Sequence, residues 1–181
     1  KEIRNLGDVS SLEKTVEGYA IVFDSLSNDL GGFHEIISRS ALDGIIEKSD
    51  VLCLLNHNED KGVLAGVKGV GSLTLSIDDR GLKYSFEAPN TALGDELLEG
   101  LRRGDISTSS FAFTVKSDYG RKGGGSYLRT INSINELFDV SPVYKAAYSS
   151  TTVNTRGLDE LKQKEQKEID EYYQELEAKL K

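Results

Sequence analysis

The residues of this sequence that could carry out catalysis are few. His57 follows the apolar run 51–55, and Ser110 ends the run Ser107-Thr108-Ser109-Ser110 directly before Phe-Ala-Phe. A serine hydroxyl is a weak nucleophile that needs a base within hydrogen-bond reach, roughly 2.6–3.2 Å. A histidine at the end of a strand can serve as such a base. Ser110 and His57 are therefore candidates for nucleophilic catalysis, although each one by itself is also typical of a polar loop.

Two carboxylates could complete such a site. Glu136 and Asp139 flank Leu137-Phe138 in a strand-like segment. A spacing of three residues is odd, so we expect the two side chains to point to opposite faces of a strand. Only one of them should then reach the imidazole and orient it. The residues alone leave open which one does so, and a solvated acid at a strand edge remains the alternative.

Other chemistries are limited by the residue inventory. With only two histidines a three-His zinc site is impossible, but a site of His34, His57 and a carboxylate stays open. Cys53 lies inside an apolar run and is expected to be a buried small side chain. The glycine-rich segment Gly120–Gly125 lacks a strand-to-helix context, so we expect a solvated connector and no phosphate loop. No bound metal or cofactor is predicted.

Composition excludes several classes of protein. The 181 residues carry a net charge of −8 and no long Lys/Arg block, so nucleic-acid binding is not expected. No apolar run approaches the ~18 residues of a membrane span. A single cysteine fits a reducing compartment, and we expect a soluble cytosolic protein. The sequence has no Met, so we expect that Lys1 is not the native start.

Hydrophobic patterning predicts a β-rich α+β fold. The segment 91–103 predicts a helix that ends at Gly104, and Ser40 predicts the start of a short one. The turn 78–81 between two alternating runs predicts a hairpin. Strands are expected at 14–23, 33–37, 51–55, 73–77, 82–86, 110–115, 127–134 and 136–144. We expect a mostly antiparallel, barrel-like sheet with a few flanking helices, because closure hides the edges of short strands.

The composition changes after residue 156. Residues 157–181 are rich in charged side chains and Gln, with a thin apolar stripe at helical spacing. We therefore expect a domain over 1–156 and a charged C-terminal helical extension over 157–181. The extension is equally typical of a solvated surface helix and of a partner-binding helix.

Taken in order, several short motifs resemble one protein family. They are Gly18-Tyr19-Ala20-Ile21-Val22-Phe23, Phe33-His34-Glu35, Leu54-Leu55-Asn56-His57-Asn58, the segment 97–104, Ile106 to Phe113, and Leu137 to Val143. Together they span about residues 15–153. They resemble the prohead proteases of tailed bacteriophages, distant relatives of the herpesvirus assemblin proteases.

The resemblance implies a function and a site. It implies an assemblin-like fold and a serine endopeptidase that cleaves scaffold and major capsid protein, and often itself, inside the immature head in the host cytoplasm. The family's catalytic histidine and serine correspond to His57 and Ser110. Asp139 stands where the family commonly has Glu, and we expect it to be the acid. The resemblance is compatible with a homo-oligomer. The rival hypotheses are a non-catalytic capsid-assembly or scaffolding protein on the same fold and a generic β-rich binding module.

Overall fold

The described part of the chain forms two β-sheets. The computed structural model describes residues 14–69, 71–123 and 126–155. The first sheet has four strands in the order β5-β6-β1-β9, all antiparallel. Their bounds are Thr74–Ile77 for β5, Gly81–Glu87 for β6, Thr15–Val22 for β1 and Thr152–Thr155 for β9. The predicted hairpin at 73–87 is confirmed as β5 and β6.

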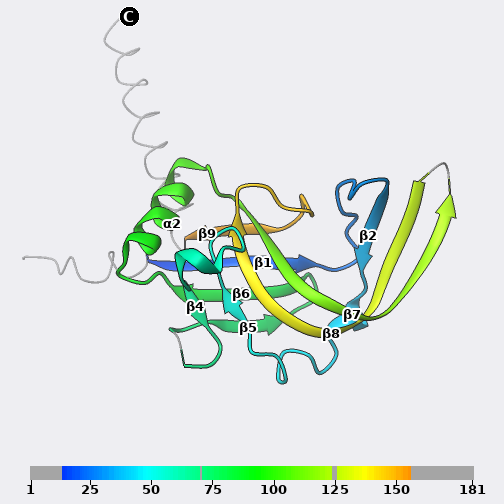
Figure 1. Ribbon diagram of the computed structural model, residues 1–181, viewed down its shortest axis with the longest axis horizontal. Helices are drawn as coiled ribbons and strands as arrows, with labels where there is room; N and C mark the ends of the chain where they lie inside the picture. Colours follow the sequence, from blue (N-terminus) through cyan, green and yellow to red (C-terminus); the bar gives the residue numbers. More distant parts are fainter. Residues whose placement is uncertain (1–13, 70, 124–125, 156–181) are drawn as a thin grey trace, which may run out of the picture.

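The second sheet is built around its longest strand, β8 (Ser126–Val143). β7 (Thr108–Gly123) pairs with β8 in antiparallel fashion, and Figure 1 shows the two as a long curved hairpin that reaches beyond the first sheet. β2 (Phe33–Ile37) and β3 (Leu52–Cys53) run parallel to β8, and β4 (Ala65–Gly66) pairs with β3. The sheets are thus mostly, but not wholly, antiparallel.

Three expectations about the strands were wrong. The described strands form two sheets and no closed barrel. The Val153 amide of β9 donates to the carbonyl of Ser107, just before β7, at 3.1 Å. The two strands do not pair further, so this bond does not join the two sheets into a barrel. The strands expected at 127–134 and 136–144 are the single strand β8. The segment 120–123, expected as part of a connector, belongs to β7, because pairing with β8 satisfies its backbone.

Helices are a minor part of the described chain. The predicted helix is confirmed as α2 (Ala92–Arg103), capped by the Thr91 side chain, with Gly104 at φ 80°. That left-handed conformation suits glycine at a helix end. Two short 3₁₀ turns cover Arg39–Leu42 and Glu59–Lys61. Within 14–155, gaps excluded, no helix is long and apolar enough to cross a bilayer. The helix expected at 157–181 lies outside the described residues.

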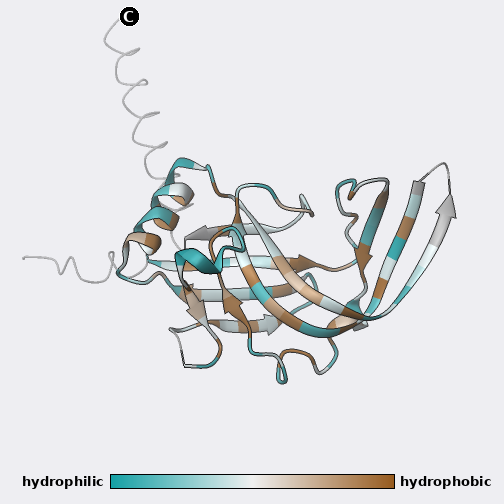
Figure 2. Cartoon of the chain, in the orientation of Figure 1, coloured by the Kyte–Doolittle hydropathy of each residue, from teal (hydrophilic) through white to brown (hydrophobic). Residues whose placement is uncertain are grey.

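One core lies between the two sheets. A single cluster of buried side chains joins Val16 and Phe86 of the first sheet to Phe111 and Val140 of the second, and Leu97 of α2 packs into it. Figure 2 shows apolar and polar residues alternating along the strands. Because side chains alternate between faces, the residues between these core positions on β7 and β8 point away from the core. That outward face carries the candidate site.

Candidate active site

His57 lies in a tight turn that follows β3. The turn spans Leu55 to Asn58, and the Asn58 amide donates to the Leu55 carbonyl at 3.2 Å. Asn56 and His57 both have positive φ, 55° and 56°, which is the pattern of a type I′ turn. The Asn56 amide donates to the Pro142 carbonyl at 2.9 Å. The turn is therefore anchored on β8, next to the strand that carries Asp139.

The conformation of His57 is costly for a residue with a side chain. Type I′ turns favour Gly or Asn at positive φ, although His adopts it more often than most residues. A non-glycine residue there costs on the order of 1 kcal/mol and is retained only where its surroundings impose it. Such conformations cluster at functional sites. The buried Leu54 and Leu55 before the turn and the bond to Pro142 supply that constraint here.

The ring of His57 contacts Asp139 directly. Its Nδ1 lies 2.7 Å from Asp139 Oδ1. The His57 side chain is 35% exposed, whereas that of Asp139 is 9% exposed. A carboxylate only accepts hydrogen bonds, so the proton of the neutral ring must be on Nδ1. Nε2 is then left with a free lone pair, as a general base requires.

Ser110 lies on the neighbouring strand and on the same face. It pairs with Ser141, and Ala112 pairs with Asp139. Directly opposed residues of antiparallel strands point to the same side of the sheet. Ser110, Ser141 and Asp139 therefore share the outward face over which the His57 turn lies. Ser110 is partly exposed, and its hydroxyl has no hydrogen-bond partner among the described residues.

The neighbours of Ser110 hold β7 in this orientation. Ser109 is fully buried; its Oγ lies 2.7 Å from the Tyr84 hydroxyl and donates to the Thr152 carbonyl at 2.8 Å. Phe111 is buried too, with its ring 5.7 Å from that of Tyr148. Both side chains point into the core. Because faces alternate along a strand, Ser110 between them must point outward.

A β-bulge corrects our expectation for the two carboxylates. Glu136 pairs with Thr114 and Asp139 with Ala112, so Phe138 is the extra residue on β8. Thr114 and Ala112 are two residues apart on one strand and share a face. Glu136 and Asp139 therefore lie on the same face, and the odd-spacing argument was wrong. Glu136 is solvent-exposed, and Asp139 alone of the two reaches His57.

Ser141 was missed by the sequence reasoning. It is fully buried, and its hydroxyl donates to Asp139 Oδ1 at 2.7 Å, the same oxygen that His57 contacts. The signal was present in the sequence, since residues two apart in a strand share a face. The Asp-Val-Ser spacing therefore places Ser141 beside Asp139.

The structure does not bring His34 to this site. His34 pairs with Leu128 through β2, while His57 contacts Asp139. Eleven residues of strand separate Leu128 from Asp139, on the order of 35 Å along the chain. The His34 ring nitrogen lies 2.9 Å from the Ser27 carbonyl. In the described ranges no group of three or more His, Cys, Asp or Glu side chains is arranged to hold a metal.

Cys53 is buried, as predicted. It is fully enclosed next to β8, and this burial, reinforced by the charge of Asp139, raises the pKa of its thiol well above the usual value. The reactive form of cysteine is the thiolate. Cys53 is therefore unsuited to act as a nucleophile.

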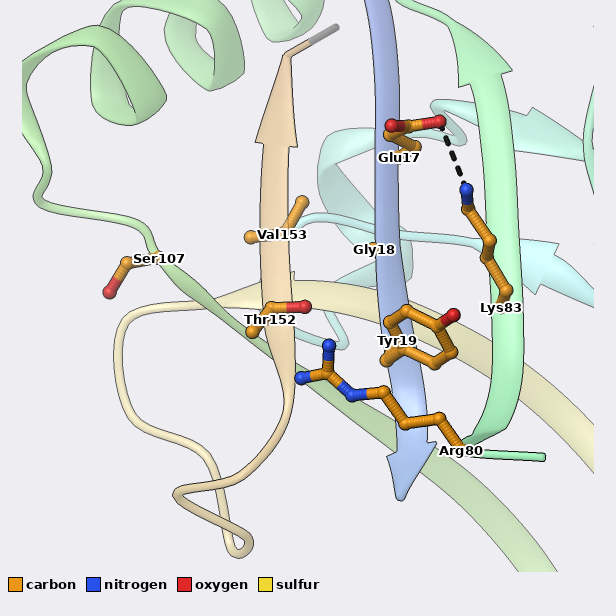
Figure 3. A pocket seen from close by; sticks show the side chains of 8 residues that line it. All are labelled: Glu17, Gly18, Tyr19, Arg80, Lys83, Ser107, Thr152 and Val153. Carbon is orange, nitrogen blue, oxygen red and sulfur yellow. Dashed lines mark ion pairs between the residues drawn. The ribbon is translucent and has the colours of Figure 1, made fainter. Parts of the chain in front are cut away.

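A surface hollow of about 360 Å³ lies apart from these residues (Figure 3). Its lining side chains come from β1, β6, β9 and the chain around them: Glu17, Gly18, Tyr19, Arg80, Lys83, Ser107, Thr152 and Val153. The two cationic side chains in this lining, Lys83 and Arg80, already have partners. Lys83 Nζ lies 3.4 Å from Glu17, and the Arg80 guanidinium lies 4.3 Å above the Tyr19 ring. The hollow contains neither His57 nor Asp139.

Comparison with known proteins yields one match. A family model described as caudovirus prohead serine protease matches residues 2–164 of the chain. That range includes His57, Ser110, Asp139 and Ser141. No curated protein and no solved structure gives a significant match.

Proposed function

Because this chain belongs to the caudovirus prohead serine protease family, we propose that Ser110, His57 and Asp139 form its catalytic triad. The chain is a serine protease. The observation that carries the assignment is the 2.7 Å contact between His57 and Asp139, with Ser110 on the same face of the adjacent strand. Cys53, Ser109 and Ser141 are buried, whereas Ser110 is partly exposed and lies on the face of Asp139, which supports Ser110 as the nucleophile.

The proposed reaction is acyl-enzyme hydrolysis of a peptide bond. Ser110 Oγ attacks the carbonyl carbon while His57 Nε2 takes the hydroxyl proton. Asp139 stabilises the imidazolium that forms. The ring then gives the proton to the leaving amine, and the C–N bond breaks to leave an ester on Ser110. Water, deprotonated by His57, hydrolyses that ester, and the proton returns to Ser110.

The hydroxyl of Ser110 has no partner among the described residues, which fits this proposal. Hydrogen bonds between nucleophile and base are often long in free enzymes and shorten when substrate binds. A serine side chain can change rotamer without moving the strand that carries it. The Ser110–His57 bond would then form as the substrate enters the site.

The proposed substrates follow from the family. A prohead protease acts in maturation of the phage head, so its substrates are phage capsid or scaffold proteins. We assign cleavage of scaffold and major capsid protein, and of the chain itself, to this site. The reaction would take place inside the immature head in the host cytoplasm.

Labelling by a fluorophosphonate probe tests the triad. The wild-type chain should be modified at Ser110, and Ser110→Ala should be inert both to the probe and in processing of scaffold. Ser107→Ala is the matched control, since Ser107 is exposed in the same run of hydroxyl residues. Normal processing by Ser110→Ala would refute the assignment of Ser110 as the nucleophile.

The boundary at residue 156 is a separate proposal. β9, the last described strand, completes the first sheet at Thr155. We expect a chain that ends at residue 156 to keep a cooperative thermal transition and its reaction with the probe, while assembly-linked processing falls. Loss of the cooperative transition would assign residues 157–181 to the folded domain.

A further inference from the structure

One oxygen of Asp139 receives two hydrogen bonds. His57 Nδ1 and Ser141 Oγ each lie 2.7 Å from Oδ1. Ser141 is fully buried, and Asp139 is 7% exposed. Since the carboxylate has no proton to donate, both partners are donors. The Asp139 carboxylate is therefore bonded both by a residue of its own strand, β8, and by the histidine of the turn after β3.

Because Ser141 is buried, water cannot readily replace its hydrogen bond to Asp139. A buried hydroxyl without a partner costs about 1–3 kcal/mol, and bonds to charged groups are stronger than neutral ones. With Ser141 at 0% exposure, solvent has no direct access to its hydroxyl. The hydroxyl proton is also engaged by Asp139, so Ser141 is no substitute for Ser110 as a nucleophile.

We propose that Ser141 is a positioning residue of the protease site, an inference that rests on the proposed triad. Its hydroxyl holds Oδ1 of Asp139 against His57 Nδ1. The imidazole is thereby held in the tautomer that leaves Nε2 free. Ser141 contacts neither substrate nor reacting atoms.

The position of Ser141 also separates Ser110 from Asp139. Ser110 faces Ser141 directly across β7 and β8, and Asp139 is only the diagonal neighbour. Diagonal neighbours lie roughly 7–8 Å apart. The Asp139 carboxylate is thus directed toward Ser141 and His57 rather than toward Ser110. This agrees with the absence of a partner for the Ser110 hydroxyl in the described part of the chain.

The test is the rate of fluorophosphonate labelling of the full-length chain. Ser141→Ala should lower the second-order rate constant by about 10- to 100-fold, the loss of one hydrogen bond to a charged group.

Two further variants complete the experiment. Ser133→Ala is the matched control, a partly buried serine of the same strand that faces Ser117, and it should leave the rate unchanged. Ser141→Cys keeps the size and a weak donor, so it should fall between wild type and Ser141→Ala. It also keeps the test usable if Ser141→Ala does not fold.

The outcomes separate the two proposals. If wild-type Ser110 is not labelled, the triad is wrong and the role of Ser141 is rejected with it. If Ser110 is labelled but Ser141→Ala behaves like Ser133→Ala, only the role of Ser141 is rejected. If Ser141→Cys is as slow as Ser141→Ala, the donor is not what matters, and Ser141 is merely structural; this result would likewise overturn the proposal.

Discussion

His57 and Asp139 are 82 residues apart in the sequence, and their side chains meet at 2.7 Å. Two features of the fold produce this contact. β3 runs parallel to β8 with Leu52 opposite Asp139, and the turn after β3 lies over that pairing. The second feature is the bulge at Phe138, which sets the face on which Asp139 lies.

Substitution of Asp139 and of Glu136, both on β8, should identify the carboxylate that orients His57. We expect Asp139→Asn to lower processing of scaffold by about three to four orders of magnitude. An Asn side chain can donate to His57 Nδ1, and that bond leaves the ring proton on Nε2, where the base is needed. Glu136→Gln should change activity little, because Glu136 is exposed. The opposite ranking would assign the role to Glu136.

Formation of the turn that carries His57 should require a residue at position 56 that adopts positive φ at little cost. Asn56 is exposed and has φ 55°. Asn56→Ala should destabilise the fold by about 1 kcal/mol and reduce probe labelling, because Ala is strained there. Asn56→Gly should retain both. Urea unfolding and labelling rates measure the two effects, and equal behaviour of the two variants would contradict the importance of the turn.

Ser109 should matter for stability, contrary to a reading of Ser107-Thr108-Ser109-Ser110 as a simple turn. Its buried hydroxyl bonds Tyr84 and the Thr152 carbonyl. Ser109→Ala should lower the free energy of unfolding by about 1–3 kcal/mol, because the buried Tyr84 hydroxyl loses its partner. Ser107→Ala at an exposed site should have almost no effect. Denaturant titration of both variants checks this, and a mild Ser109→Ala would disagree with the network.

Cys53 should be unreactive while the chain is folded. Burial raises the pKa of its thiol, so the thiolate is disfavoured at pH 8, and the side chain is fully enclosed. We expect alkylation by iodoacetamide to be slower than in urea by roughly 100-fold or more, since the thiol reacts only after opening. Mass spectrometry over time measures both rates. Rapid alkylation of the folded chain would mean that β3 is open to solvent.

The sequence by itself determined the local elements and the two strongest candidates for chemistry. The alternating runs at 73–87 and the capped helix after Thr91 depend on near neighbours, and both formed as predicted. His57 and Ser110 were found because each follows or precedes an apolar strand. Periodicity and capping are local properties, so the amino-acid order is sufficient to reveal them.

The family resemblance favoured Asp139 as the acid, and the tertiary structure showed that this carboxylate contacts His57 and what holds it. A bulge is set by pairing between distant strands, and it placed Glu136 and Asp139 on one face where regular alternation predicted two. The arrangement in two sheets likewise depends on which strands pair, and local sequence does not specify that. The contact of Ser141 with Asp139 follows from strand alternation, but the full burial of Ser141 depends on tertiary packing. The sequence identifies the candidate residues, and pairing between distant strands determines which of them lie together.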